Sequence, residues 1–172
     1  TRLARDERVQ VVAAPGPFNF AALCNRGIRQ SNGDTVVLLN NDTEVLTDSW
    51  LTTLCSWAAE PGVGAVGPQL RYPDGRIQHA GLAGMATGGT GHLFVARDPA
   101  AESPLGLARC PREVLAVTGA CLAVRRDAYW DVGGLDERHV PNDSGDIDLC
   151  LRLRRSGRVS LYAPDAVLIH HE

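Results

Sequence analysis

The stretch LLNNDTEV, from Leu38 to Val45, ends an apolar run in two amides and a carboxylate. The run itself, Thr35 to Leu39, is β-branched and leucine-rich without the alternation of a half-exposed strand, which predicts a buried central strand. Its ending in Asn40, Asn41 and Asp42 has two interpretations. These residue types adopt turn conformations readily, so they could simply close the strand. In an α/β sheet, however, ligands bind beyond the carboxyl ends of strands, where such side chains could hold a metal ion and a phosphate group.

The composition bounds the class of protein. The chain has 172 residues, which fits a single domain, and 44% hydrophobic residues are enough for one core. Its charges are mixed with a net charge of −3, which argues against a nucleic-acid-binding protein, because such proteins usually carry a basic stripe. No apolar stretch approaches the ~20 residues of a membrane span, and no signal peptide stands at the start. We therefore expect a cytoplasmic protein, for which peripheral attachment to the inner face of the cytoplasmic membrane stays open.

The five cysteines are odd in number, and none belongs to a CxxC pair. Most of them lie among apolar residues, so we interpret them as reduced, buried thiols and expect neither a disulfide framework nor a zinc site. They are Cys24, Cys55, Cys110, Cys121 and Cys150.

Strand and helix patterns alternate along most of the chain. Strands are expected at residues 9–13, 35–39, 63–66, 114–117, 121–124, 159–162 and 166–169, with a hairpin over residues 70–78. Helices are expected at residues 18–30, 47–60, 126–132 and 146–156. Residues 80–112, rich in Gly, Ala and Pro, form an expected long loop of the kind that is often functional or mobile. The alternation predicts an α/β sandwich with a largely parallel sheet.

A second acidic motif, GDID from Gly145 to Asp148, lies at the start of the last expected helix. Acids there cap free N–H groups and favour the helix dipole, which accounts for at least one of them. Asp146 and Asp148 stand about 200° apart around a helix of 3.6 residues per turn, so they cannot both face one site. Asp148 can pair with Arg152 at i,i+4 spacing, which leaves Asp146 to point into a cleft as a candidate general base.

Four histidines are further candidates. His170 and His171 follow the last expected strand, and because adjacent residues of an extended segment face opposite ways, at most one enters a given site. Histidines at strand ends are more often surface residues, but neutral imidazole beside a carboxylate also suits Mn²⁺ or a similar ion. If the last strand runs parallel to residues 35–39, its histidines lie at the same sheet edge as the LLNNDTEV motif. His79 and His92, which flank the glycine-rich segment, carry little information by themselves.

Common nucleotide-binding and hydrolase motifs are missing from the sequence. No GxGxxG follows a strand and no GKS or GKT occurs, so neither a dinucleotide site nor a P-loop is supported. GxSxG is also absent, which removes the usual signature of an α/β-hydrolase.

Taken in order, several motifs closely resemble family 2 glycosyltransferases, and most of all the bacterial, rhamnosyltransferase-like branch that builds O-antigen and other surface polysaccharides. The motifs, which run from about Phe18 to Glu172, are LLNNDTEV, SWL, VGAVGPQLRYPDGRIQHAG, AVTGACLAVRRDAYWDVGGLDE, GDIDLCLRLRRSG and YAPDAVLIHHE. The resemblance implies a GT-A fold, which is a Rossmann-like α/β arrangement with a mixed sheet flanked by helices. It also implies an inverting transfer of a sugar from a nucleoside-diphosphate sugar to a glycan or lipid-linked acceptor.

The same resemblance implies roles for single residues. In that family an Asp-x-Asp-type motif ends a central strand and holds a divalent cation, Mn²⁺ or Mg²⁺, on the diphosphate. Here the motif reads Asn-Asn-Asp at residues 40–42, so Asp42 would be its metal-binding carboxylate, joined by His170 after the last strand. The family's catalytic base falls on Asp146, although the preceding position, an acid or amide in the family, is Gly145 in this chain.

The acceptor side of the site corresponds in the family to a segment that falls on Thr118, Gly119 and Ala120, and to a turn that contains Asp136. Asn40 and Asn41 would lie near the donor diphosphate and sugar. His79, His92, Asp148 and Arg152 complete the set of candidate site residues.

Family members begin with a strand–helix–strand unit that holds the nucleobase and ribose, and this chain starts after most of that unit. We therefore expect residues 1–172 to form a single glycosyltransferase-like domain, a piece of a longer protein whose nucleotide-binding unit is incomplete. Such a piece would expose a sheet edge, which favours a homo-oligomer. Two other hypotheses stay open: a non-catalytic sugar-nucleotide or glycan-binding module on the same fold, kept open by Asn40 and Gly145, and a nucleotidyltransferase.

Overall fold

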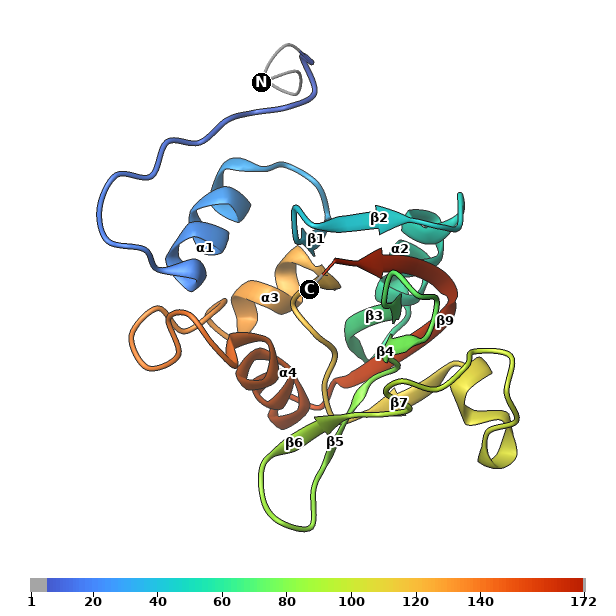
Figure 1. Cartoon of the computed structure of the whole chain (residues 1–172). Helices are drawn as coiled ribbons and strands as arrows, with labels where there is room; N and C mark the ends of the chain where they lie inside the picture. Colours follow the sequence, from blue (N-terminus) through green and yellow to red (C-terminus); the bar gives the residue numbers. More distant parts are fainter. Residues whose placement is uncertain (1–5, 172) are drawn as a thin grey trace.

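The structure, a computed structural model, describes residues 6–171 and has the expected α/β architecture of a mixed sheet flanked by helices (Figure 1). The main sheet has the order β1-β8-β3-β9-β2, with β4 pairing with β3 and β7 pairing with β9, and β5 and β6 form a separate hairpin. The strands are β1 (Thr35–Leu39), β2 (Thr43–Val45), β3 (Val63–Arg71), β4 (Ile77–His79), β5 (Leu82–Gly84), β6 (Thr90–His92), β7 (Arg112–Val114), β8 (Cys121–Arg125) and β9 (Val159–His170).

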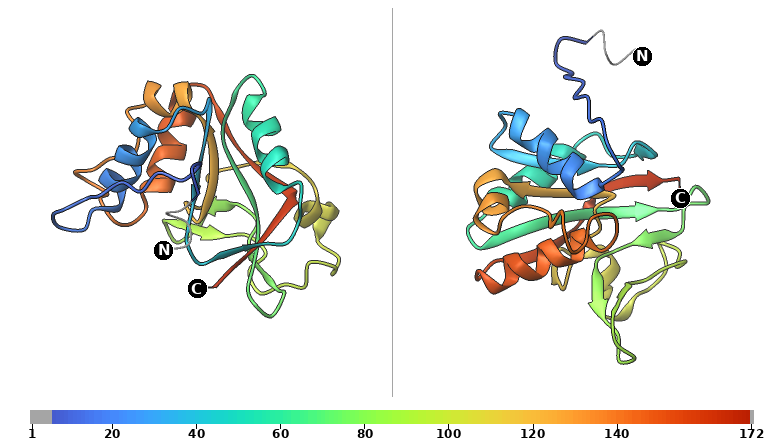
Figure 2. Two further views of the ribbon diagram at one scale, coloured as in Figure 1. Left: turned by 90° about the horizontal axis from the view of Figure 1, so that it is seen from above. Right: turned by 90° about the vertical axis from the view of Figure 1, so that its left-hand side faces the viewer.

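Helices cover both faces of this sheet (Figure 2). On one face, the core joins the sheet to α1 (Phe20–Gln30), α3 (Arg126–Asp131) and α4 (Gly145–Arg155). On the other face, α2 (Trp50–Ala59) buries Leu54 and Ala58 against β3 and β9. Because β3 is covered from both sides, it is buried over all but its last residue. A short 3₁₀ segment, η2 (Pro104–Arg109), precedes β7.

The prediction of a largely parallel sheet is wrong for the described strands. Only β3 and β9 pair in parallel, while β8 runs antiparallel to both β1 and β3, and β2, β4 and β7 pair antiparallel to their neighbours. The reason lies in the connection from β3 to β8. After β4 and β7, the chain begins β8 beside the carboxyl end of β1, where Cys121 pairs with Leu39. Strand β8 therefore runs back antiparallel to β1, whereas a parallel strand would have to begin at the opposite end of the sheet.

The strand at Thr35–Leu39 forms as expected but is not central. It has one neighbour, β8, among the described strands, and its burial alternates until Leu39, which is 46% exposed. A continuous apolar run therefore does not distinguish a central strand from an edge strand whose faces are partly covered.

Three other local expectations also change. Residues 9–13 are not a strand but irregular chain. The glycine-rich segment contains the β5–β6 hairpin, in which Leu82 pairs with His92, and the short helix η2. The two final strands are one continuous strand, β9.

Between the two expected strands, at residues 159–162 and 166–169, the chain forms a bulge and does not leave the sheet. Beside β3, Pro68 pairs with Ala163 and Gln69 pairs with Val167, so β9 advances four residues while β3 advances one. The three additional residues let β9 follow β3 on both sides of the irregularity.

The carboxyl ends of several strands lie together at one end of the sheet. Strands β1, β3 and β9 point the same way, because β8 is antiparallel to β1 and β3 while β3 is parallel to β9. Their carboxyl ends therefore meet there, together with the start of β8. Because α4 leads into the amino end of β9, its own amino end lies with these strand ends as well (Figure 2).

Candidate functional site

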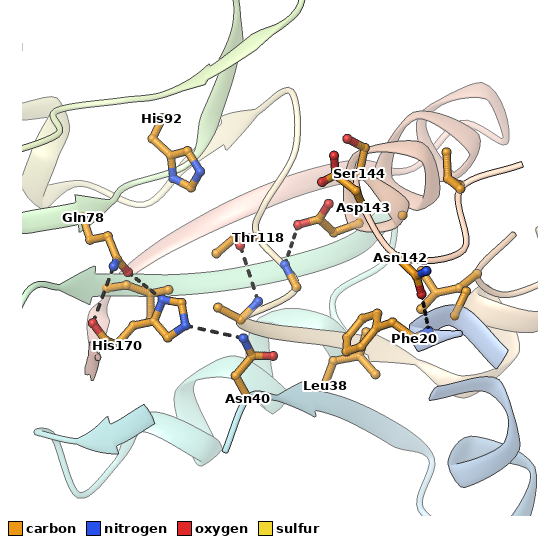
Figure 3. A pocket seen from close by; sticks show the side chains of 18 residues that line it. Phe20, Leu38, Asn40, Gln78, His92, Thr118, Asn142, Asp143, Ser144 and His170 are labelled. Atoms are coloured by element: carbon orange, nitrogen blue, oxygen red, sulfur yellow. Dashed lines mark hydrogen bonds between the residues drawn. The ribbon is translucent and has the colours of Figure 1, made fainter. Parts of the chain in front are cut away.

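A cavity of about 350 Å³ opens at this edge of the sheet (Figure 3). Its walls come from the ends of β1, β3, β4 and β9, the starts of α1 and α4, the segment between α3 and α4, the segment before β8 and one residue of the β5–β6 hairpin. Among the predicted site residues, those that line it are Asn40, His92, Thr118, Gly119, Ala120, Asp146 and His170.

His170 joins the ends of β1 and β9. Its ring is buried, with Nε2 3.3 Å from Oδ1 of Asp42 and 3.4 Å from Nδ2 of Asn40. On the other side of the ring, Nδ1 lies 2.9 Å from Oε1 of Gln78. The main chain fixes the same arrangement, because the N–H of His171 donates to the carbonyl of Asp42 over 2.9 Å. The LLNNDTEV motif and the end of the chain thus form one polar cluster.

Asp146 lies in the first turn of α4 and faces the same cavity. Its Oδ2 accepts the backbone N–H of Gly119 at 2.6 Å, and its Oδ1 accepts that of Ile147 at 2.8 Å. Ser144, just before the helix, has a φ of +59°, a left-handed conformation that is uncommon for a residue other than glycine. The carboxylate is thus held in place by backbone donors at the cavity wall, where it could accept a proton from a bound molecule.

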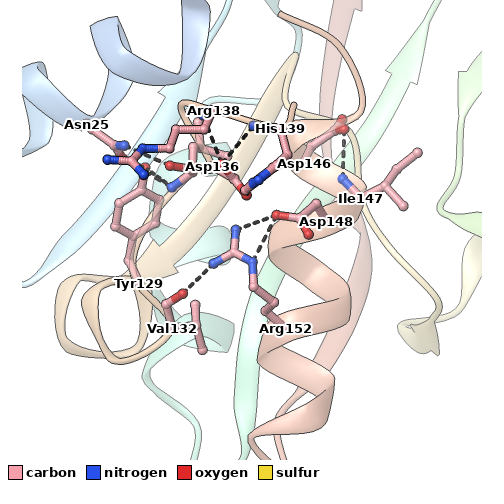
Figure 4. A network of polar contacts seen from close by, with 11 residues as sticks. Asn25, Tyr129, Val132, Asp136, Arg138, His139, Asp146, Ile147, Asp148 and Arg152 are labelled. Atoms are coloured by element: carbon pink, nitrogen blue, oxygen red, sulfur yellow. Dashed lines mark hydrogen bonds and ion pairs between the residues drawn. The ribbon is translucent and has the colours of Figure 1, made fainter. Parts of the chain in front are cut away.

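Asp148 turns away from the cavity, as the helical spacing predicted. Its Oδ2 accepts from Nε and Nη2 of Arg152 at 2.9 and 2.6 Å, and Nη1 of Arg152 donates to the carbonyl of Val132 (Figure 4). This pair ties α4 to the end of α3. Asp148 and Arg152 therefore have a structural role in the described structure.

Asp136 also lies outside the cavity. Its carboxylate accepts the backbone N–H groups of His139 and Arg138, at 3.0 and 2.9 Å, and lies 2.7 Å from Nδ1 of His139. These bonds hold the pKa of Asp136 well below its usual value, and the bond from the His139 backbone has the largest effect. Asp136 shapes the turn that leads toward α4, and Asn41 is exposed on the surface.

His79 and His92 contact each other. Their Nδ1 atoms are 2.9 Å apart and their rings meet edge to face. His79 is fully buried, and this burial, reinforced by nearby His92 and Arg112, lowers its pKa well below 6.5, so its ring is neutral. The pair connects β4 to the β5–β6 hairpin, and only His92 reaches the cavity.

Sequence reasoning missed two polar contributors to the cavity wall, Gln78 and Asn142. Gln78 precedes His79 in β4 and contacts His170. Asn142 accepts the N–H of Phe20 at 3.0 Å and so ties the segment before α4 to the start of α1. A buried amide within an apolar strand was the available signal for Gln78, because such a group needs hydrogen-bond partners.

Asp42, just after β1, and His170, the last residue of β9, could serve as two ligands of one divalent cation. The Asp42 carboxylate and the His170 imidazole are donor types that suit Mn²⁺, and their 3.3 Å separation lets both reach one ion. Among residues 6–171, no group of three His, Cys, Asp or Glu side chains is placed to hold a metal ion. Such an ion would therefore need oxygens from a bound ligand or from water.

The sequence matches the family described as glycosyltransferase-like family 2 over residues 2–172. An uncharacterized Sinorhizobium fredii protein, y4gI, is 43% identical over 171 residues, which are 97% of this chain and 18% of that protein. The O-antigen biosynthesis protein RfbC of Myxococcus xanthus is 40% identical over 169 residues, 97% of this chain and 13% of RfbC. The N-acetylglucosaminyl-diphospho-decaprenol L-rhamnosyltransferase of Mycobacterium tuberculosis is 34% identical over 146 residues, 81% of this chain and 47% of that enzyme. The chain thus spans less than half the length of each of these relatives.

Two solved structures share the fold. GalNAc-T7, crystallised with UDP, GalNAc and Mn²⁺, superposes with a TM-score of 0.68 over 90% of this chain and 30% of its own, at 14% identity. The mannosyltransferase PcManGT of Pyrobaculum calidifontis, in complex with GDP-Man and Mn²⁺, gives 0.57 over 87% of this chain and 35% of its own, at 18% identity. At these identities the likeness concerns the fold alone, and the predicted GT-A fold is confirmed.

Proposed function

Because this chain belongs to glycosyltransferase-like family 2, we propose that it carries the catalytic part of an inverting glycosyltransferase. The enzyme moves a sugar from a nucleoside-diphosphate sugar to a glycan or lipid-linked acceptor in the synthesis of a bacterial surface polysaccharide. The names of two relatives, an O-antigen biosynthesis protein and a rhamnosyltransferase acting on a diphospho-decaprenol acceptor, support this choice of product and acceptor.

One observation carries the proposal. Asp42, Asp146 and His170 come from three distant parts of the sequence, yet all three lie at the same edge of the sheet, two of them on the cavity wall and Asp42 in contact with His170. This is the edge at which α/β sheets bind their ligands. A carboxylate–imidazole pair and a separate carboxylate on one cavity are what a metal-assisted group transfer needs.

In this proposal the roles divide between the two sides of the cavity. Asp42 and His170 hold a divalent cation, Mn²⁺ or Mg²⁺, which when bound offsets the negative charge that grows on the leaving diphosphate. Asn40, 3.4 Å from the His170 ring, borders the donor. Thr118, Gly119 and Ala120 border the acceptor.

Asp146 acts as the general base. It takes the proton of the acceptor hydroxyl while that oxygen bonds to the anomeric carbon and the bond from this carbon to the diphosphate oxygen breaks. Attack from the face opposite the leaving group inverts the configuration, so no covalent sugar–enzyme intermediate is needed. The backbone N–H groups of Gly119 and Ile147 keep the carboxylate in place for this step.

The location of the protein follows from its acceptor. We place the reaction in the cytoplasm at the inner face of the cytoplasmic membrane, where a lipid-linked acceptor would present its sugar. Within residues 6–171, no helix is both long and apolar enough to cross a membrane. A homo-oligomer remains part of the proposal, because β1 has one sheet neighbour among the described strands.

A non-catalytic module that binds sugar nucleotides or glycans is the second candidate. It is favoured by the incomplete acidic motifs, in which Asn40 stands where the Asp-x-Asp motif has its first acid and Gly145 stands where the family has an acid or an amide, and by the two-residue metal set. It predicts donor binding without turnover.

The full-length protein provides the test. We expect UDP-, GDP- or dTDP-sugars, one of them most strongly, to raise its melting temperature in the presence of Mn²⁺, and labelled sugar to move to an acceptor. Stabilisation without transfer would favour the binding module. Release of pyrophosphate from a nucleoside triphosphate would favour a nucleotidyltransferase, and the absence of any stabilisation would contradict the proposal.

A further inference from the structure

Gln78 contacts His170 at two points (Figure 3). Its Oε1 lies 2.9 Å from Nδ1 of the His170 ring, and its Nε2 donates to the His170 main-chain carbonyl over 3.5 Å. The residue is 5% exposed. Strand β4 can bring it there because β4 and β9 both pair with β3.

The second of these contacts determines how the amide is oriented. The carbonyl oxygen of His170 can only accept, so the group that Gln78 turns toward it must be the –NH₂. The amide oxygen then faces Nδ1 of the ring. In the opposite orientation, two carbonyl oxygens would face each other in a buried place, which is unfavourable.

The amide orientation in turn determines the tautomer of His170. An oxygen at 2.9 Å from Nδ1 can only accept, so Nδ1 must carry the proton. In the neutral ring Nε2 then has a lone pair. The contact on that side agrees, because the –NH₂ of Asn40 can donate to Nε2 over 3.4 Å. The Asp42 carboxylate, 3.3 Å from Nε2, thus faces a second acceptor.

We propose that Gln78 is the positioning residue of this site. It holds His170 in the Nδ1–H tautomer and so directs the Nε2 lone pair, beside Asp42, at a divalent cation. Imidazoles that bind metals usually donate their other N–H to a carbonyl or carboxylate, which fixes ring orientation and raises basicity. The role toward a cation rests on the proposed function, whereas the tautomer does not.

The tautomer can be measured on the metal-free protein. Nitrogen-15 spectra of histidine-labelled protein at about pH 8, where an ordinary imidazole is neutral, distinguish the two ring nitrogens. The signal that disappears in His170→Asn belongs to His170. We expect its Nδ1 to be protonated, and a proton on Nε2 would overturn the proposal.

Two variants then test the effect on metal binding. Gln78→Leu removes both contacts and should weaken Mn²⁺ binding, followed by electron paramagnetic resonance in the presence of a nucleoside diphosphate, by about 10–100-fold. Gln78→Glu keeps an acceptor for Nδ1–H and should retain the tautomer and most of the affinity. A residue needed only for packing would show the reverse order, because a buried carboxylate costs more than a buried leucine.

The outcomes separate the two proposals. If Gln78→Leu retains the Nδ1–H tautomer and the wild-type Mn²⁺ affinity, the positioning role is wrong. If the wild-type protein binds no Mn²⁺ with any nucleoside diphosphate, the proposed function fails, and the tautomer of the wild type and of Gln78→Leu still decides whether Gln78 controls the ring.

Discussion

Two polar clusters of this molecule contain similar residue types but use them in opposite ways. Under α1, the buried Asn25 donates to the Leu135 carbonyl and to Glu137, at 2.9 and 2.8 Å, and accepts from Tyr129 and the Leu135 N–H (Figure 4). At the cavity, in contrast, the Asp42 carboxylate lies 3.3 Å from Nε2 of His170, a residue that lines the cavity. The first cluster completes its own hydrogen bonds and stabilises the fold. The second leaves polar groups directed at a space that a ligand can enter.

The largest expected effect tests the cavity cluster. Asp146→Asn should lower turnover by about 10²–10⁴-fold, because an amide cannot take the acceptor proton. Its melting temperature should change little, since the amide oxygen can still accept the Gly119 N–H. Steady-state kinetics of the full-length enzyme, together with thermal unfolding, provide the measurement.

Asp148→Asn is the matched control, two residues along the same helix. It weakens the pair with Arg152 and should reduce stability by about 0.5 kcal/mol while turnover stays normal. Normal turnover in Asp146→Asn would remove the assignment of the base.

The next largest effect tests the cluster around Asn25, whose hydrogen bonds are made within the protein. Asn25→Leu should lower the free energy of unfolding by about 3 kcal/mol, because buried partners such as the Tyr129 hydroxyl and the Leu135 carbonyl lose their bonds. Urea denaturation measures this change. Tyr129→Phe, which removes one hydroxyl, should cost less, and kcat per folded molecule should be unchanged in both variants. If either variant lost activity without losing stability, the Asn25 cluster would have a role in function, and the distinction between a structural and a functional cluster would be wrong.

The third prediction concerns Asp42. Asp42→Asn should weaken Mn²⁺-dependent binding of a nucleoside diphosphate by about 30-fold, since losing a contact made by a charged group costs roughly 2 kcal/mol. Calorimetric titration is the measurement. The apo protein should melt normally, because the Asp42 side chain is 45% exposed. Asp48→Asn, at an exposed acid near the start of α2, should leave the binding unchanged.

The smallest effect concerns His79, which belongs to neither cluster. Burial, His92 and Arg112 lower its pKa well below 6.5 in the folded chain, whereas an unfolded chain titrates near ~6.5. Between the two pKa values the unfolded state binds the additional proton. The stability contributed by the neutral ring is therefore complete above ~pH 6.5 and is lost as pH falls, by up to ~1.4 kcal/mol per pH unit.

Unfolding followed from pH 7.5 to 5 should show this decline in the wild type and a flatter profile in His79→Leu. His139→Gln is the control, since His139 lies on the surface. An equally steep decline in His79→Leu would assign the effect to another group.

Much of the site could be predicted because it depends on short-range geometry. The helical spacing of Asp146 and Asp148 was enough to send one to the cavity and the other to Arg152. The sequence also placed His170 at the same end of the sheet as the LLNNDTEV motif, but the contact of Asp42 with His170 depends on the pairing of β2 with β9, in which Thr43 lies opposite His170.

The missed features depend on contacts between distant residues. The His79–His92 contact requires that β5 and β6 form a hairpin beside β4, and nothing local in a glycine-rich segment fixes that register. The role of Gln78 likewise depends on β4 and β9 sharing β3 as a neighbour. Residues 35–39 seemed central because apolar content reports burial and not the number of neighbouring strands.

The bulge in β9 changes whether the odd-numbered or the even-numbered residues of the strand face α2. Before it, odd-numbered residues such as Leu161 and Ala163 pack on the α2 side; after it, the even-numbered Leu168 does so. His170 follows the alternation that begins after the bulge, so the bulge, several residues earlier, determines the direction of its side chain. A deletion in the bulge that shifts the register of the residues after it should exchange His170 for His171 at Gln78, whereas a deletion that the bulge absorbs should not. A metal titration of the deletion variant distinguishes the two results.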